Sequence, residues 1–209
     1  MSNILEQLAA ASGQREQDRN IAMAQQIAAA KDKKAVKTLI EGLEHKTKAL
    51  RHDCIKTLYE TAALAPELIS PYTQQFLQLL DNKDNRLQWG AMTVLSAIAP
   101  LVLPLLYEAL PRLVAVADAG SVITRDHLVR ILVSLAGKTA YAADAVPLLL
   151  EQLLQAPANQ APSYAEQALP VIGPADKEKF RQVLHTRLDD MEQESKRKRI
   201  EKVLKKLGT

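Results

Sequence analysis

The chain has few of the residues from which covalent or membrane-bound frameworks are built. Cys54 is its single cysteine, so no disulfide can form within the chain, and we expect a reducing compartment such as the cytoplasm. No apolar run approaches the roughly 18 residues that mark a membrane-spanning helix. Aromatic residues make up only 4% of the sequence. The core must therefore be aliphatic, and we expect no membrane association.

Motifs for catalysis or cofactor binding are also scarce. The four histidines are far apart: His45, His52, His127 and His185. None has a partner at metal-ligand spacing, and there is no CxxC, glycine-rich phosphate loop or GxSxG. His52 and His127 each adjoin an aspartate, but neighbouring residues on a helix do not face each other. We therefore expect no enzymatic activity, no cofactor and no metal.

What the sequence does have is self-similarity at a step of 37 residues. A period between about 20 and 50 residues is typical of a solenoid, in which stacked repeats share one continuous core. Four apolar columns keep the step: Leu58, Leu95, Leu132 and Leu169; Cys54, Ala91, Leu128 and Ala165; Leu39, Phe76, Leu113 and Leu150; and Leu43, Leu80, Ala117 and Leu154.

Each repeat reads as two helices. In one second helix, apolar residues at offsets 0, 4, 8 and 11 form a single stripe at 3.6 residues per turn. The regular repeats span 34–173, between an N-terminal cap pair at 1–31 and a C-terminal cap pair at 174–209. We predict one all-α domain, 1–209, of about five to six helix pairs. The predicted helices are 2–12, 14–31, 34–44, 49–63, 66–81, 85–99, 100–118, 121–136, 138–156, 160–172, 174–191 and 195–207.

Two polar columns accompany the apolar ones. The acidic column reads Glu44, Asp81, Asp118 and Gln155, and the basic column reads Arg51, Gln88, Arg125 and Pro162. The pattern resembles the HEAT-repeat family of right-handed α-solenoids. The resemblance implies that these columns form a ladder between repeats and that the second helices line the concave side. HEAT proteins share no common chemistry, so the resemblance implies a binding scaffold without specifying its ligand.

The second helices carry the candidate binding residues of this concave face. A large aromatic residue and a methionine are plausible anchors for a protein partner, flanked by charges that set orientation. The predicted site comprises Trp89, Met92, Tyr59, Lys56, Arg130 and Asp126. A competing interpretation is that Trp89 fills a gap between repeats and that the Met92 column is tucked between helices.

The last predicted helix carries the densest basic cluster. We define the basic patch as Lys196, Arg197, Lys198, Arg199 and Lys202. Clustered cations favour nucleic acid or an acidic partner through counterion release. The alternative is a cap helix with a solvated outer face and lysines suited to the helix dipole. No aromatic residue interleaves with these cations, which disfavours stacking on single-stranded bases.

A remote alternative is a relative of the HEAT-like alkylpurine DNA glycosylases. His52, Trp89 and Asp126 share one column, as aromatic and acidic residues do on the working face of those enzymes. Residues 57–175 contain six Lys or Arg and ten Asp or Glu, and this net negative charge would repel duplex DNA. A protein partner is therefore favoured over nucleic acid. The oligomeric state does not follow from the sequence.

Overall fold

The computed structural model describes residues 4–8 and 16–208, whose regular secondary structure is helical, with no strand among them. The all-α prediction is therefore confirmed. Within the predicted helix 2–12, the structure describes a single 3-10 turn, η1 (Ile4–Gln7), and most of the remainder lies outside the described residues. No helix in the described ranges has both the length and the apolar character to cross a membrane.

The chain divides into two compact units, Met1–Thr124 and Arg125–Thr209. The prediction of one domain over 1–209 stays a prediction. The first unit contains α2 (Glu16–Ala30), α3 (Lys33–Gly42), α4 (Lys48–Leu64), α5 (Pro66–Ile69), η2 (Ser70–Tyr72), α6 (Thr73–Leu79), α7 (Asn85–Ile98), η3 (Ala99–Leu101), α8 (Leu103–Glu108) and α9 (Leu110–Ala119). Helix α10 (Val122–Ala136) crosses the boundary, and the second unit continues with α11 (Thr139–Leu154), α12 (Ala161–Ala168), η4 (Leu169–Val171), η5 (Pro174–Asp176), α13 (Lys177–Asp189) and α14 (Glu194–Leu207).

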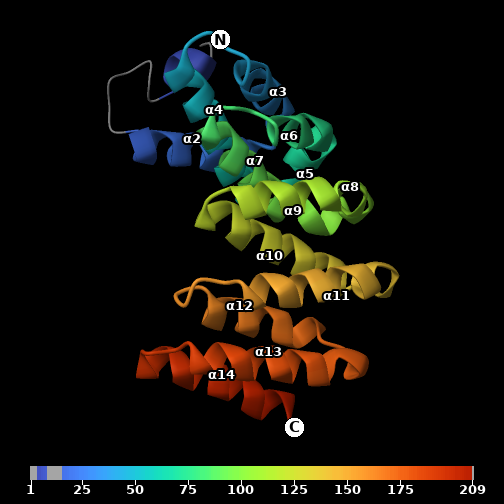
Figure 1. The fold of residues 1–209 in the computed structure, drawn as a ribbon. Coiled ribbons are helices and arrows are strands. Elements are labelled where there is room, and N and C mark those ends of the chain that lie inside the picture. The colour runs from blue at the N-terminus through green and yellow to red at the C-terminus, as the bar shows by residue number, and fades with distance from the viewer. Residues whose placement is uncertain (1–3, 9–15, 209) are drawn as a thin grey trace. The chain divides into compact units, whose positions relative to one another are not determined.

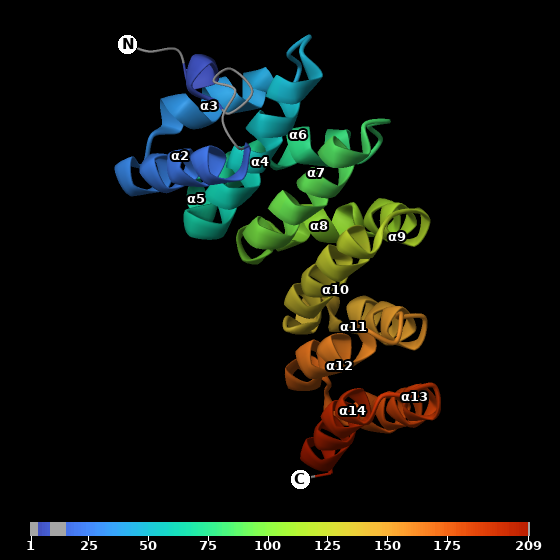
Figure 2. The same cartoon turned by 90° about the vertical axis from the view of Figure 1, so that its left-hand side faces the viewer.

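In the first unit the second helices stack side by side. Helix α4 packs between α2 and α7, while α3 and α6 pack behind α4 and α7 as a second layer (Figures 1 and 2). The predicted core columns are buried here, and Cys54, Leu58, Ala91 and Leu95 are all 0% exposed. The 37-residue step therefore corresponds to successive helix pairs that share one aliphatic core.

A glycine sets how closely α4 and α7 approach. A Cβ atom on Gly90 would lie 2.5 Å from Cγ1 of Ile55, which is nearer than real Cβ contacts come. Ile55 is fully buried, so its side chain occupies the space that Gly90 leaves open. The missing side chain lets the two helices pack at short range.

Prolines divide the first helices more than the pattern predicts. The predicted helix 66–81 consists of α5, the 3-10 turn η2 with Pro71, and α6. The predicted helix 100–118 consists of η3, α8 and α9, with Pro104 and Pro111 in the first turns of α8 and α9. Proline has no N–H to donate and its ring clashes with the preceding turn, so each helix restarts at the proline.

The second unit repeats the arrangement with α11 packed on α13 and α12 packed on α14. Leu128, Leu132 and Ala165 are fully buried, as their columns predict. Leu154 is an exception, because it is 43% exposed whereas Leu43, Leu80 and Ala117 are at most 5% exposed. Leu154 is the last residue of α11, where the helix ends.

Three of the four residues in the basic column bond backbone carbonyls near the ends of the first helices. Arg51 donates to the carbonyl of His45 at 2.9 Å, Gln88 to that of Leu80 at 2.8 Å and Arg125 to that of Gln155 at 3.4 Å, whereas Pro162 has no donor. Carbonyls in the last turn of a helix lack partners within the helix, so these side chains cap them. Asp81 of the acidic column pairs with Arg112, 2.5 Å away on α9.

Candidate functional site

The exposed side of α4 and α7 brings two aromatic rings together. The ring centroids of Tyr59 and Trp89 lie 5.7 Å apart with a 45° angle between the ring planes. Both side chains are half-buried. The centroid separation and tilt fall within the range of favourable aromatic pairs. We call these two residues the aromatic pair. Both were predicted to line the concave face, and the structure places them in contact.

Lys56 lies beside the aromatic pair but is only 7% exposed. Its Nζ donates to Glu60 Oε1 at 3.0 Å and to the Tyr59 hydroxyl at 3.3 Å. Burial alone lowers the pKa of Lys56, but the hydrogen bonds from its ammonium group to Glu60 and Tyr59 outweigh that effect and raise it. Lys56 therefore stays charged, and Glu60 neutralises it locally.

The prediction for Met92 is wrong, because its side chain is fully buried and cannot contact a partner. Ile55 and Val129, one repeat before and after it, are also 0% exposed. Ile55 lies between α4 and α7, against Gly90, as the competing interpretation held for this column. In the first unit the close approach at Gly90 brings Ile55 over the neighbouring turn of α7.

Asp126 and Arg130 belong to the second unit, whereas Lys56, Tyr59 and Trp89 belong to the first. Asp126 accepts a 2.6 Å hydrogen bond from the hydroxyl of Tyr164, which is 1% exposed. Burial, together with this bond, raises the pKa of Tyr164. Arg130 is exposed. The Asp126 carboxylate therefore joins α10 to α12 and has a structural partner already.

A carboxylate that the sequence analysis missed lies at the start of α7. Asp84 caps this helix by accepting from the N–H of Arg86 at 3.1 Å. Nε2 of His52 on α4 lies 2.8 Å from the same carboxylate, with Arg51 3.8 Å and Lys48 3.9 Å away. Burial raises the pKa of Asp84, but the bonds from His52 and the Arg86 N–H outweigh it and lower it. Asp84 therefore ties α4 to α7.

Most of the basic patch is engaged within the second unit. Arg199 holds Glu166 with two hydrogen bonds of 2.8 and 2.6 Å, and they lower the pKa of that carboxyl. Arg197 donates to the carbonyl of Leu188 at 3.0 Å. Lys196 bonds Asn159, and Lys198 lies 3.4 Å from Glu194.

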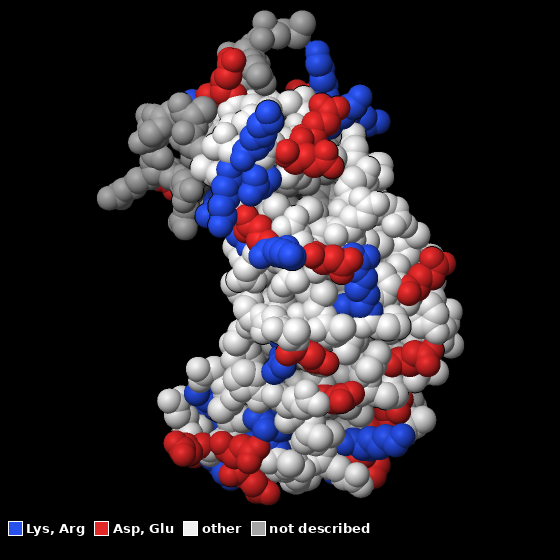
Figure 3. Space-filling view, turned by 45° about the horizontal axis from the view of Figure 1, so that its top comes forward, with Lys and Arg blue, Asp and Glu red and all other residues white. Residues whose placement is uncertain are grey.

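Of the patch, Lys202 is exposed and interacts at longer range with Glu166. Lys, Arg, Asp and Glu are interspersed over the face drawn in Figure 3. These pairings suit the terminal-cap interpretation of the helix better than a site reserved for phosphates.

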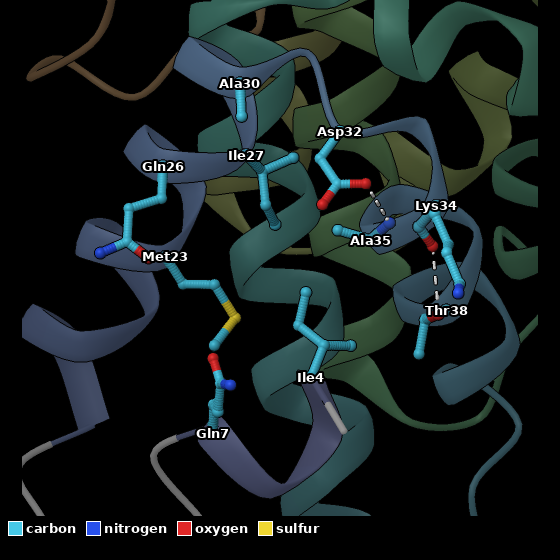
Figure 4. Close-up of a pocket in the computed structure, with 10 residues that line it drawn as sticks. All are labelled: Ile4, Gln7, Met23, Gln26, Ile27, Ala30, Asp32, Lys34, Ala35 and Thr38. Atoms are coloured by element: carbon cyan, nitrogen blue, oxygen red, sulfur yellow. Dashed lines mark hydrogen bonds between the residues drawn. The ribbon is translucent and has the colours of Figure 1, made fainter. Parts of the chain in front are cut away.

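A hollow of about 550 Å³ lies at the N-terminal end of the first unit, between η1, α2 and α3 (Figure 4). Met23, Ile27 and Ala35 form its apolar floor. The Asp32 carboxylate accepts from the N–H of Ala35 at 2.9 Å, and the Thr38 hydroxyl donates to the carbonyl of Lys34 at 3.1 Å. These polar groups serve helix α3 itself. Across the described ranges, no cluster of three or more His, Cys, Asp or Glu side chains could hold a metal.

No protein-family model matches the chain, and no curated protein matches it. Solved structures do match. One is a designed armadillo repeat protein in complex with the peptide (KR)4, with a TM-score of 0.69, 18% identity and coverage of 98% of both chains.

Two further matches are similar in extent. Computationally designed armadillo repeat proteins for modular peptide recognition match with a TM-score of 0.68, 18% identity and 97% coverage of both chains. An engineered protein matches with a TM-score of 0.65, 19% identity and 99% coverage of both chains. At these identities the likeness shows the fold alone: the chain is an all-α helical-repeat solenoid of the armadillo and HEAT type.

Proposed function

We propose that the protein is a non-enzymatic scaffold that binds a peptide segment of a protein partner on the exposed side of α4 and α7. The observation that carries the proposal is the half-buried aromatic pair, Tyr59 and Trp89, on the outer side of two packed second helices. Aromatic side chains supply large apolar contact area and dominate the energetics of many interfaces. Peptide recognition by designed proteins of the same fold supports the proposal.

The surroundings of the pair favour binding over catalysis. Cys54 is fully buried, and burial together with the neighbouring Asp53 raises its pKa to about 12, so its thiol is neutral and inert at pH 7. The His52 ring is held by Asp84 at the start of α7. The His52–Asp84 contact thus ties α4 to α7, Lys56 and Glu60 neutralise each other on α4, and the two rings are left as the proposed contact surface.

The test is an unbiased peptide selection followed by calorimetry. Random peptides displayed on phage are selected on the wild-type chain, and the enriched peptides are titrated into wild type and Trp89→Ala. We expect the substitution to weaken binding by at least about tenfold, or roughly 1.4 kcal/mol, as for an interface hot spot. Tyr72→Ala is the matched control, because Tyr72 is also half-buried but lies in η2, among the first helices.

Helicity of each variant is checked by far-UV circular dichroism. If the selected peptides bind wild type, Trp89→Ala and Tyr72→Ala with equal affinity, the aromatic pair is not the binding site and the proposal fails.

A further inference from the structure

Positive charge is concentrated in one of the two helix layers of the second unit. The second helices of this unit are α10 from Arg125 onward, α12 and α14, and Figure 2 shows α12 and α14 on one side with α11 and α13 on the other. The three second helices contain nine Lys or Arg and four Asp or Glu, whereas the rest of the unit contains five and seven. We call the exposed side of these three helices the cationic face.

Three of the nine cations bond to neutral groups, so their charge is not cancelled. Arg125 and Arg197 each donate to a backbone carbonyl, and Lys196 bonds an amide oxygen. These bonds satisfy the donors without supplying a negative charge. Burial lowers the pKa of His127 to about 4, so this ring is neutral at pH 7 and does not alter the balance.

Two of the four carboxylates are already held within the layer. Asp126 accepts a 2.6 Å hydrogen bond from a buried tyrosine hydroxyl on α12. Glu166 accepts two bonds from Arg199, and these bonds lower the pKa of its carboxyl. The charges of Lys202 and Lys206 lower that pKa further, which places both lysines near the same carboxylate. Three cations therefore lie around one carboxylate, and the local charge is positive.

The other two carboxylates lie on α14, and each is matched by a lysine. Glu194 lies 3.4 Å from Lys198 in the first turns, about 12 Å along the axis from Lys202, which exceeds the Debye length of about 8 Å. Glu201 and Lys205 are both exposed and are four residues apart, the spacing at which opposite charges neighbour each other on a helix. These two pairs leave the charge of Lys202 uncompensated.

Arg130 and Lys202 are the cations that this face offers to a ligand. Both are exposed, and neither side chain forms a hydrogen bond or ion pair within residues 4–8 and 16–208. Helix α12 lies between them, because it is bonded to α10 through Asp126 and packs on α14. Packed helices lie about 8–10 Å apart, so the helices that carry the two cations are separated by about 16–20 Å.

We infer that the cationic face binds an extended acidic segment of a protein, whose carboxylates pair with Arg130 and Lys202. An extended chain rises about 3.3 Å per residue, so five to six residues span roughly the distance between α10 and α14. Charge complementarity then sets both the orientation and the choice of partner. This surface lies on other helices than the aromatic pair, so the inference goes beyond the proposed function and does not depend on it.

A peptide suits this face better than a nucleic acid. Proteins that bind duplex DNA commonly neutralise about 6–10 phosphates, whereas this face has two cations without a partner. The Glu166 side chain is 44% exposed and would repel a phosphate, but a peptide N–H can donate to it. Tyr164, the only Phe, Trp or Tyr in the three helices, is 1% exposed and cannot stack on a base.

The test follows fluorescein-labelled hexaglutamate by fluorescence anisotropy as the full chain is added. We expect hexaglutamate to bind and (KR)4 to give no signal, with affinity that falls between about 50 and 200 mM salt. The double variant Arg130→Gln/Lys202→Gln should bind hexaglutamate at least about tenfold more weakly. Lys177→Gln/Lys179→Gln is the matched control, because it removes two exposed cations from α13 and should change the affinity by less than about twofold.

Three results would overturn the inference. Hexaglutamate that does not bind wild type refutes the ligand class, and equal weakening by the two double variants refutes the assignment to the cationic face. A 12-base-pair DNA duplex that binds more tightly than hexaglutamate at the same salt, and loses affinity in Arg130→Gln/Lys202→Gln, makes nucleic acid the occupant instead. Circular dichroism verifies the fold; if the double variant does not fold, Lys202→Gln alone should weaken hexaglutamate about threefold, and an unchanged affinity counts against the site.

Discussion

Replacing Gly90 by alanine tests the close packing of α4 on α7 that positions the aromatic pair. The added Cβ would lie 2.5 Å from Cγ1 of Ile55, so one helix must move or Ile55 must leave its place. Overpacking of a core costs about 1–3 kcal/mol. Alanine is preferred over glycine inside a helix by roughly 1 kcal/mol, which offsets part of this cost. We expect a net loss of up to about 2 kcal/mol in the free energy of unfolding.

The second half of the experiment removes the obstacle. Ile55→Ala alone should cost about 2–5 kcal/mol, because a fully buried side chain leaves a cavity. In the double variant the new methyl group of residue 90 enters that cavity. The double variant should therefore be about 1–2 kcal/mol more stable than the sum of the single effects predicts, as expected for residues in direct contact.

Urea unfolding followed by Trp89 fluorescence reports on this helix pair, because Trp89 adjoins Gly90. Gly173→Ala is the control: its backbone φ is −74° and no atom lies within 4 Å of an added Cβ, so it should change stability by less than about 0.5 kcal/mol. A stabilising Gly90→Ala, or strictly additive single effects, would refute the close approach of α4 and α7.

Three further predictions concern the second unit. Burial, with the nearby charge of Arg130, lowers the pKa of His127 to about 4, so the folded protein should lose up to about 3 kcal/mol of stability as the pH falls from 6.5 towards 4. In thermal unfolding over this pH range, His127→Gln should lose less stability than wild type. His185→Gln, a substitution at an exposed position, should lose as much as wild type. Tyr164→Phe removes the donor to Asp126 and should cost about 1–2 kcal/mol in urea unfolding followed by circular dichroism; an effect below about 0.3 kcal/mol would deny that bond a role. Arg197→Ala removes the cap on the Leu188 carbonyl and should cost about 1 kcal/mol by the same measurement, whereas Lys198→Ala, which removes an exposed ion pair, should cost less than about 0.5 kcal/mol.

The sequence predicts the fold because the same apolar core positions recur in several repeats along the chain. The predicted second helices 49–63 and 85–99 correspond to α4 (Lys48–Leu64) and α7 (Asn85–Ile98), within about one residue at each end. The first helices are less well predicted, since internal prolines divide them. An apolar column that recurs in several repeats is a strong signal of a core position, whereas a proline affects only the helix in which it occurs.

The candidate site is less predictable for a physical reason. Periodicity gives the angle of a side chain around its helix but not the distance to the next helix. Trp89 and Met92 both point away from the main apolar stripe, yet Trp89 is half-buried and Met92 is fully buried. The missing information is the contact of Gly90 with Ile55. Glycine inside an otherwise apolar helix was the available signal, because it often marks a close approach of backbones.

Pairings between repeats escape sequence analysis in the same way. Arg199 and Glu166 are 33 residues apart, and His52 and Asp84 are 32 apart, close to one repeat but off the exact 37-residue step. A column search at fixed spacing cannot find them. They become visible only when the stacked second helices bring the two side chains together.

The distribution of polar contacts supports the aromatic pair as the proposed binding surface. Arg51, Gln88 and Arg197 cap carbonyls of first helices, while Asp84, Asp126 and Glu166 join neighbouring second helices. These polar groups are therefore engaged in holding the stacked helices together. The aromatic pair is held by α4 and α7 and stays partly exposed, and rigid aromatic side chains lose little conformational entropy on binding, which supports the proposed binding surface.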